Sequence, residues 1–287
     1  MLTRTFCHLP GIHLRTERHL WQSGIDSWDA FLEYGAERLS ARRAQTLRPL
    51  IEQSLQHLAD ANPCFFAEWL PSDQLWRLFA DFRDHIAYVD IETTGMGSWE
   101  DYITTIALYD GRSIFYYVQG ENLRDFEEAI SRYQVIVTYN GKCFDVPFIE
   151  RTLRFKVPHV HIDLRYVLKR LGYTGGLKGC ERKLGLDRAE LEDVDGYCAV
   201  LFWQEYRARR DERALETLLA YNIQDTVNLE ALMVKAYNLS LSQTPFSPHL
   251  ALPEPAPPVS PFMADMETVY RILRIKSMTS GFPPSRE

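Results

Sequence analysis

One stretch decides the fold of this chain: Ala87-Tyr88-Val89-Asp90-Ile91-Glu92-Thr93-Thr94-Gly95. It is an apolar run interrupted by two carboxylates, and this alternation predicts a β-strand with a charged tip. Because successive side chains on a strand point to opposite faces, Asp90 and Glu92 lie on the same side. Neighbouring carboxylates repel each other, and a divalent metal ion with oxygen ligands would relieve that repulsion. The alternative is an exposed strand end on which two acids happen to alternate. Whether other carboxylates join this pair decides between a metal site and an exposed strand end.

The composition is that of a globular protein. Of its residues, 46% are hydrophobic and 25% are charged. The length of 287 residues is enough for one large domain with an appendage. No apolar run approaches the ~20 residues that span a bilayer, and no secretion signal is recognisable, so we expect a cytoplasmic monomer that binds no membrane. The five cysteines are scattered without a Cys-x-x-Cys pair, which predicts no disulfide-linked partner and no structural zinc site. The net charge of -7 does not indicate nucleic-acid binding through a broad basic face, but it does not exclude nucleic-acid binding.

The two ends of the chain differ in character from its middle. Residues 1–84 are predicted to form a helical appendage, in which Asp26 caps a helix that starts at Trp28. Residues 241–287 are predicted to form a proline-rich extended strap, followed by a helix at 262–275, because proline cannot take part in helix or sheet ladders.

The appendage opens with a stretch that resembles a helix-hairpin-helix element, Leu9-Pro10-Gly11-Ile12-His13. In such an element, backbone N–H groups of the hairpin contact a phosphate. The resemblance is degenerate, because His13 stands where the motif has a second glycine and Glu17 replaces a small residue. The alternative is a helical pair with a purely structural role.

Residues 85–240 are predicted to form an α/β domain with a mixed β-sheet flanked by helices. Three strands joined as an antiparallel meander come first, and helices then alternate with two short buried strands. The strands are expected at residues 85–91, 102–109, 113–119, 135–138 and 160–164. This order of elements is that of ribonuclease-H-like folds.

Two further motifs add acids to the first pair. Asp145 follows the strand at 135–138 and lies at a loop-to-helix junction, where it could also be an ordinary helix cap. Tyr221 and Asp225 are four residues apart in a predicted helix, so they share one face. For an isolated pair, packing of the tyrosine would be the simpler interpretation.

Taken in order, these three motifs resemble those of the DEDDy 3′-5′ exonucleases. Their spelling is similar to that in the proofreading domain of B-family DNA polymerases, and the whole chain looks most like bacterial proteins with a YprB-type ribonuclease-H-like domain. The resemblance covers roughly residues 85–238 and implies a stand-alone nuclease, because no polymerase domain accompanies it.

The resemblance also implies two Mg²⁺ or Mn²⁺ ions and a role for each acid. Asp90 would bridge both ions, Glu92 and Asp225 would complete the site of the ion that activates water, and Asp145 would hold the second ion. Tyr221 would orient the attacking water, since a phenol with a pKa of about 10 is a poor base at neutral pH.

The substrate implied by the resemblance is single-stranded DNA, with RNA as the alternative. The residues implied to contact it are Thr93, Gly95, Met96, Asn140 and Phe144.

Other interpretations of the same residues remain. A binding module of the same fold that does not cleave is disfavoured, because such a module has no need of four repelling carboxylates. A structure-specific endonuclease would differ in releasing fragments instead of mononucleotides. His159, His161 and Asp163 alternate on one predicted strand face and could ligate zinc, but ligands on a single strand converge poorly on one ion.

Overall fold

The computed structural model describes residues 1–186, 188 and 191–279. By its internal contacts the chain divides into two units. The helical unit comprises Met1–Arg83 and Ala236–Pro253, and the sheet unit comprises Asp84–Lys235 and the chain from Glu254 onward. The strap predicted from residue 241 is therefore shared between the two units instead of forming a segment of its own.

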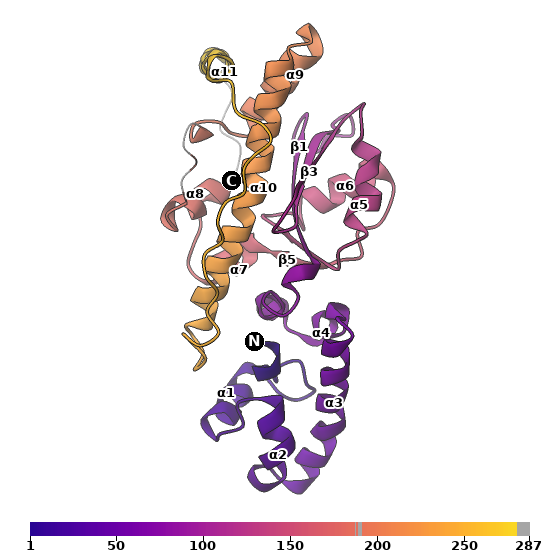
Figure 1. The fold of residues 1–287 in the computed structure, drawn as a ribbon, viewed down its shortest axis with the longest axis vertical. Coiled ribbons are helices and arrows are strands. Elements are labelled where there is room, and N and C mark those ends of the chain that lie inside the picture. The colour runs from indigo at the N-terminus through magenta and orange to yellow at the C-terminus, as the bar shows by residue number, and fades with distance from the viewer. Residues whose placement is uncertain (187, 189–190, 280–287) are drawn as a thin grey trace. The chain divides into compact units, whose positions relative to one another are not determined.

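The sheet unit is built on a five-stranded mixed sheet with the strand order β3-β2-β1-β4-β5 (Figure 1). The first three strands are antiparallel neighbours, and β4 and β5 run parallel to β1. This confirms the predicted fold class. The bounds of the strands are β1 Ile86–Thr93, β2 Ile103–Tyr109, β3 Ile114–Val118, β4 Val135–Thr138 and β5 Val160–Asp163.

The alternation along β1 determines which layer each side chain enters. Ala87, Val89 and Ile91 are buried in a hydrophobic cluster with side chains of α5 (Phe126–Ile130) and α6 (Asp145–Leu153). Asp90 and Glu92 point to the opposite face, which α10 covers (Glu212–Leu241) (Figure 1). The apolar face of the strand thus stabilises the fold through burial, and the opposite face carries the two acids of the candidate site.

The other helices of the sheet unit are α7 Leu164–Arg170, α8 Gly176–Lys183, α9 Gly196–Arg209 and α11 Met266–Thr279. Side chains of α9, α10 and α11 share one hydrophobic cluster. Between α9 and α10 the chain turns at Arg210, whose φ of 56° is left-handed, and the residue types there gave no sign of this break. The C-terminal helix begins at Met266, four residues later than the sequence predicted.

The helical unit has an aromatic core. Trp28 and Phe66 stack with ring centroids 6.0 Å apart, and His8 packs against both rings. The helices of this unit are α1 Leu14–Gln22, α2 Trp28–Arg38, α3 Ala41–Ala59 and α4 Pro63–Trp69, with 3-10 helices at Leu2–Arg4 and Ser72–Leu78.

One prediction for the helical unit is wrong. Ser27, not Asp26, caps α2, because its hydroxyl lies three residues before the Ala30 amide that needs an acceptor; Asp26 instead pairs with Arg4 at 2.8 Å. The helix-hairpin-helix interpretation stays a prediction. Within residues 1–13, all of which the structure describes, the chain before the hairpin holds a single 3-10 turn and no α-helix.

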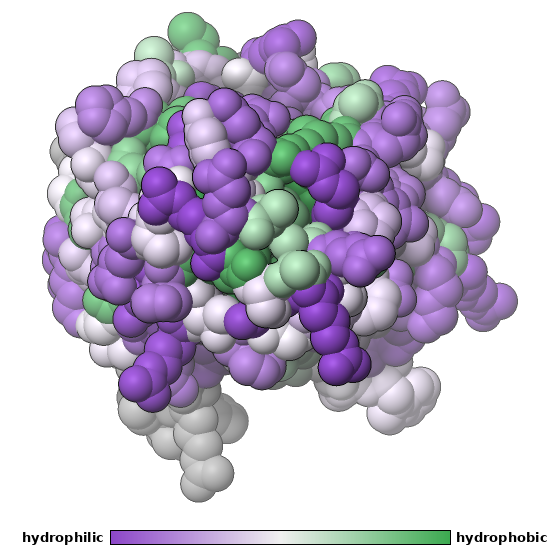
Figure 2. All heavy atoms as spheres, turned by 90° about the horizontal axis from the view of Figure 1, so that it is seen from below, coloured by the Kyte–Doolittle hydropathy of each residue, from purple (hydrophilic) through white to green (hydrophobic). Residues whose placement is uncertain are grey.

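The surface is mostly polar on the face that Figure 2 shows, with hydrophobic side chains scattered between hydrophilic ones. This is the usual mixture on the exterior of a folded protein. Among the described residues, none of the helices combines the length and the apolarity needed to cross a membrane.

Candidate metal centre

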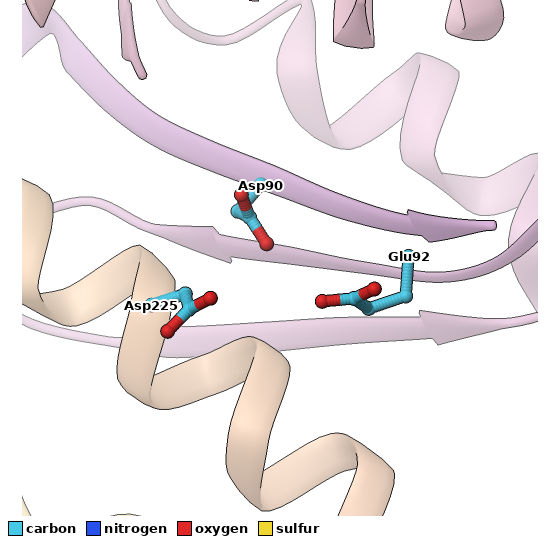
Figure 3. A group of neighbouring side chains, drawn as sticks. All are labelled: Asp90, Glu92 and Asp225. Carbon is cyan, nitrogen blue, oxygen red and sulfur yellow. The ribbon is translucent and has the colours of Figure 1, made fainter. Parts of the chain in front are cut away.

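Three carboxylates meet between β1 and α10. Each of Asp90, Glu92 and Asp225 offers one oxygen, and these oxygens all lie within 4.8 Å of one another. Figure 3 shows the three carboxylates turned toward a common point, two of them from the strand and one from the helix. No second group of potential metal ligands of this kind occurs in residues 1–186, 188 and 191–279.

Asp145 lies beside this group but is not a member of it. It is the first residue of α6, it is buried, and burial raises the pKa of its carboxyl group to about 7. Its negative charge in turn contributes to the raised pKa values of Asp90 and Glu92. The structure therefore places three of the four predicted acids in one group, with the fourth close enough to act on them through its charge.

Removal from water and mutual repulsion make ionisation of these acids costly. Burial is the main reason why the pKa values of Asp90 and Glu92 lie well above the ordinary range, and the charges of Asp225 and Asp145 raise them further. A cation that approaches within bonding distance removes this penalty. Hard divalent ions with oxygen ligands, such as Mg²⁺ or Mn²⁺, match such a set of carboxylates, so the residues fit the metal that the sequence implied.

Asn222 positions Asp90, and the sequence analysis missed it. Its side-chain amide donates a hydrogen bond of 2.7 Å to Asp90 Oδ2, and its own oxygen accepts one of 3.0 Å from Thr105 Oγ1. Asn222 is fully buried. It lies three residues before Asp225 on the same helix, and this spacing was the available signal.

Arg188 is the second residue that the sequence analysis missed. Its guanidinium group is 1% exposed, lies 2.6 Å from Asp225 Oδ1 and also pairs with the buried Glu181 of α8. Arg188 occurs in no periodic pattern that would mark it as buried, so the sequence contained no signal for it.

Tyr221 is buried one helical turn before Asp225. A hydrogen bond from its hydroxyl group lowers the pKa of Asp225, while burial and the charges of Asp225 and Glu92 raise the pKa of Tyr221 itself well above its ordinary value. The phenol therefore stays protonated at neutral pH. Lys178 lies with Nζ 5.8 Å from the Tyr221 ring centroid. Its ammonium group donates to the carbonyl oxygens of Glu192 and Val194.

The loop after β1 carries the residues predicted to contact substrate. Thr93 Oγ1 donates to the carbonyl oxygen of Gly95 at 2.6 Å. A Cβ atom at Gly95 would lie 2.4 Å from Asp101 Oδ1, so a larger residue would displace that carboxylate. Met96 is 79% exposed, and Trp99, which the sequence analysis did not single out, is 87% exposed.

This loop is held by its own hydrogen bonds. The Asp101 carboxylate accepts from the amides of Gly97 at 2.9 Å and Ser98 at 2.7 Å. Arg151 of α6 donates to the carbonyl oxygen of Asp101 at 3.2 Å, and its guanidinium carbon lies 4.3 Å from the centroid of the Phe148 ring. Met96 and Trp99 are therefore presented to solvent by an ordered turn.

The loop after β4 contains the other predicted contact residues. Asn140 has a left-handed φ of 66°, and its side-chain oxygen accepts a hydrogen bond of 2.6 Å from Arg165. Phe144 is half-buried and packs against Phe148 with ring centroids 5.0 Å apart. Asp163 holds this loop by accepting from the amides of Asn140 and Lys142.

The alternative zinc site finds no support in the contacts of its residues. His161 hydrogen bonds with Thr138 Oγ1 at 2.8 Å, and His159 with the carbonyl oxygen of Ile130 at 3.0 Å. Asp163 is engaged by backbone amides. Each of the three side chains thus has a structural partner, as residues of a buried strand usually do.

The match to a family profile agrees with this architecture. A profile of the RNase_H superfamily matches residues 87–237, which are 151 of the 287 residues, and the chain belongs to the RNase H superfamily. Among solved structures the chain is similar to the family B DNA polymerase from the hyperthermophilic archaeon Pyrobaculum calidifontis, with 17% sequence identity and a TM-score of 0.41. That match covers 54% of this chain and 26% of the polymerase chain, so it spans about a quarter of the polymerase. No curated protein matches the sequence.

Proposed function

We propose that this protein is a divalent-metal-dependent nuclease that removes nucleotides from the 3′ end of single-stranded nucleic acid, with DNA as the preferred substrate. The observation that carries the proposal is the group of three carboxylates between β1 and α10 of an RNase H superfamily member, with Asp145 beside it. This group has the composition that binding of hard metal ions requires.

Hydrolysis of a phosphodiester needs an activated water, neutralisation of charge on the phosphate and a stabilised leaving oxygen, and a pair of divalent ions supplies all three when bound. The residues of this chain provide the frame. Asp90, Glu92 and Asp225 would hold the ions, with Asp145 assisting from the start of α6. Asn222 keeps the Asp90 carboxylate in one orientation through its hydrogen bond.

Tyr221 acts as a hydrogen-bond donor in this proposal. Because its pKa is raised well above the ordinary value, its hydroxyl group keeps its proton at neutral pH and cannot act as a general base. Its hydroxyl group orients the Asp225 carboxylate, and with substrate present it is placed to orient the attacking water as well.

The exposed side chains of the loop after β1 support a single-stranded substrate. Bases of an unpaired strand stack on aromatic side chains, and such contacts need no particular base sequence. Trp99 offers such a ring, and Met96 offers an exposed apolar side chain, in the loop at the end of the strand that carries Asp90 and Glu92. In this proposal, the end of the nucleic-acid strand binds next to these side chains and is cleaved at the acid group, which is exonuclease activity.

The test uses 5′-labelled single-stranded DNA and RNA with Mg²⁺ or Mn²⁺, resolved on a gel. We expect a ladder that shortens one nucleotide at a time from the 3′ end, faster on DNA, and no products in excess chelator. An oligonucleotide of the same sequence labelled at the 3′ end should release labelled mononucleotide first. Internal fragments would indicate an endonuclease instead, and binding without any cleavage would indicate a non-catalytic binding module.

A further inference from the structure

Arg188 is the cation in closest contact with the acid group. Its NH1 lies 2.6 Å from Asp225 Oδ1, and its Nε donates to Glu181. Glu181 is itself 1% exposed and also accepts a hydrogen bond of 2.8 Å from Asn228. One buried guanidinium group therefore joins α8 to the metal-ligand face of α10.

The hydrogen bonds of Arg188 are incomplete for a buried arginine. Among the residues that the structure describes, NH1 and NH2 of Arg188 and Oδ1 of Asp225 are buried and make no hydrogen bond of ordinary geometry, although NH1 and Oδ1 lie only 2.6 Å apart. The pair is thus held mainly by opposite charge and not by the bidentate geometry that arginine and carboxylate prefer. Lys178 is a second cation near the acids, and its ammonium group donates hydrogen bonds to backbone carbonyl oxygens.

We propose that Arg188 is the internal counter-ion of the acid group: it holds Asp225 and stabilises the metal-free fold, at the cost of weaker metal binding. This inference rests on the proposed function, because it takes Asp90, Glu92 and Asp225 to bind divalent ions. Arg188 is a positioning residue that acts through Asp225, since its contacts are with the protein and not with the reacting atoms.

A linkage relation makes the inference testable. A residue that stabilises the metal-free protein more than the metal-bound protein must weaken metal binding by the same free energy. Removing the charge of Arg188 should therefore destabilise the metal-free protein strongly and the Mn²⁺-bound protein less. The affinity for Mn²⁺ should rise accordingly.

The experiment measures the Kd for Mn²⁺ by calorimetry, and the Tm in chelator and in saturating Mn²⁺, for the wild type, Arg188→Met and Arg188→Lys. For Arg188→Met we expect a Kd lower by about 5-fold or more, the lower end of ordinary coupling between sites, and a larger Tm gain from Mn²⁺. Arg188→Lys keeps the charge, so its Kd should stay within about 3-fold of wild type, less than that coupling.

Arg77→Met in the helical unit is the matched control. Arg77 forms a second buried arginine–glutamate pair, with Glu17 at 2.8 Å, and both side chains are almost completely buried. Its loss should lower stability by the same amount with and without Mn²⁺ and leave the Kd for Mn²⁺ unchanged.

Other results overturn the inference. Equal Tm losses of Arg188→Met in chelator and in Mn²⁺ would make Arg188 an ordinary structural residue, and a higher Kd would make it a residue that only orients Asp225. If Arg188→Met does not fold, Glu181→Gln is the deciding variant. It removes the charge of Glu181, so that Arg188 pairs with Asp225 alone and competes more strongly with the metal ion. The Kd for Mn²⁺ should therefore rise, and an unchanged or lower Kd overturns the inference. Wild-type protein that binds no Mn²⁺ would overturn the proposed function and this inference together, whereas unchanged affinities in a cleaving enzyme would overturn only the inference.

Discussion

The helical unit and the sheet unit each contain a buried arginine paired with a glutamate, and the two pairs differ in how completely their charges are satisfied. In the helical unit, Glu17 accepts from both terminal nitrogens of Arg77, at 2.8 and 2.9 Å, and from the backbone amides of Phe6 and Cys7. Arg77 also donates to Gln74 and Thr5. Both charges of this pair therefore have their partners within the fold.

In the sheet unit, Arg188 faces more negative charge than it can neutralise. It pairs with Glu181 and Asp225, while Asp90 and Glu92 share the same space and have strongly raised pKa values. An ion pair such as Arg77–Glu17 has a structural role, because its hydrogen bonds already offset the cost of removing both charges from water. An acid group with excess negative charge is stabilised further by an added cation or by protonation, and this distinguishes a binding site from a structural ion pair.

The largest expected effect is on activity, from Asp90→Asn. Loss of a metal-holding carboxylate should lower kcat roughly 10³-fold or more, since metal positioning supplies most of the rate in such sites. The Tm in chelator should be equal to or higher than that of wild type, because the change removes one of the repelling charges. Undiminished cleavage, measured with labelled single-stranded DNA, would exclude Asp90 from the active site.

Glu17→Gln tests the other side of the comparison. It leaves the Arg77 charge buried without its partner, which typically costs about 3 to 5 kcal/mol of unfolding free energy. Denaturant unfolding of the full chain should show this loss in the transition of the helical unit. The Kd for Mn²⁺ of the folded protein should not change; a change there would mean that the Glu17 pair is more than structural.

Tyr221→Phe separates orientation from metal binding within the sheet unit. We expect kcat to fall roughly 10- to 1000-fold, the range of a lost proton-transfer or positioning group, with the Kd for Mn²⁺ little changed. Single-turnover rates at saturating Mn²⁺ measure this effect. Wild-type kcat would reduce Tyr221 to a packing residue and contradict the DEDDy assignment.

Trp99→Ala tests whether the ordered loop after β1 contacts bases. Stacking on an aromatic ring contributes about 1 to 3 kcal/mol per base, so KM for single-stranded DNA should rise roughly 5- to 100-fold with little change in kcat. Trp99→Phe should retain most of the binding. The matched control is Trp69→Ala, which removes another exposed tryptophan, 53% exposed, from the helical unit. An effect of the same size in both variants would mean that exposed apolar area, and not this loop, affects binding.

The smallest expected effect concerns pH and the helical unit. Burial, with a further contribution from the positive charge of Arg77, lowers the pKa of His8 from 6.5 to about 3. The unfolded chain therefore takes up a proton below pH 6.5 that the folded unit does not, so stability falls as pH decreases through the range from 6.5 to about 3. Between pH 6 and 5 the loss should be about 1 kcal/mol. His8→Gln should flatten this part of the profile; an unchanged slope would show that another group titrates there.

The residues that build the sheet were largely predictable because they interact locally. Alternation along β1 gave the strand and the side on which Asp90 and Glu92 lie, and the predicted antiparallel meander placed β2 beside β3. The order of the acids along the chain, together with the position of Tyr221, also pointed to their common site. The cap of α2 and the start of α11 were misplaced, because a helix end depends on single hydrogen bonds that neighbouring residues compete to form.

The amino-acid sequence by itself determined the fold class and the identity of the candidate acids, because strand alternation and helical spacing follow from backbone geometry. The tertiary structure alone decided which groups hold those acids in place. Asn222 reaches Asp90 across 132 residues of chain, and Arg188 reaches Asp225 from outside any regular element described. Helical spacing places Asn222 near the face of Asp225, but no short-range pattern encodes the contact of Asn222 with Asp90 or that of Arg188 with Asp225. These contacts arise only when packing of α10 on the sheet brings distant side chains together in a space that excludes water.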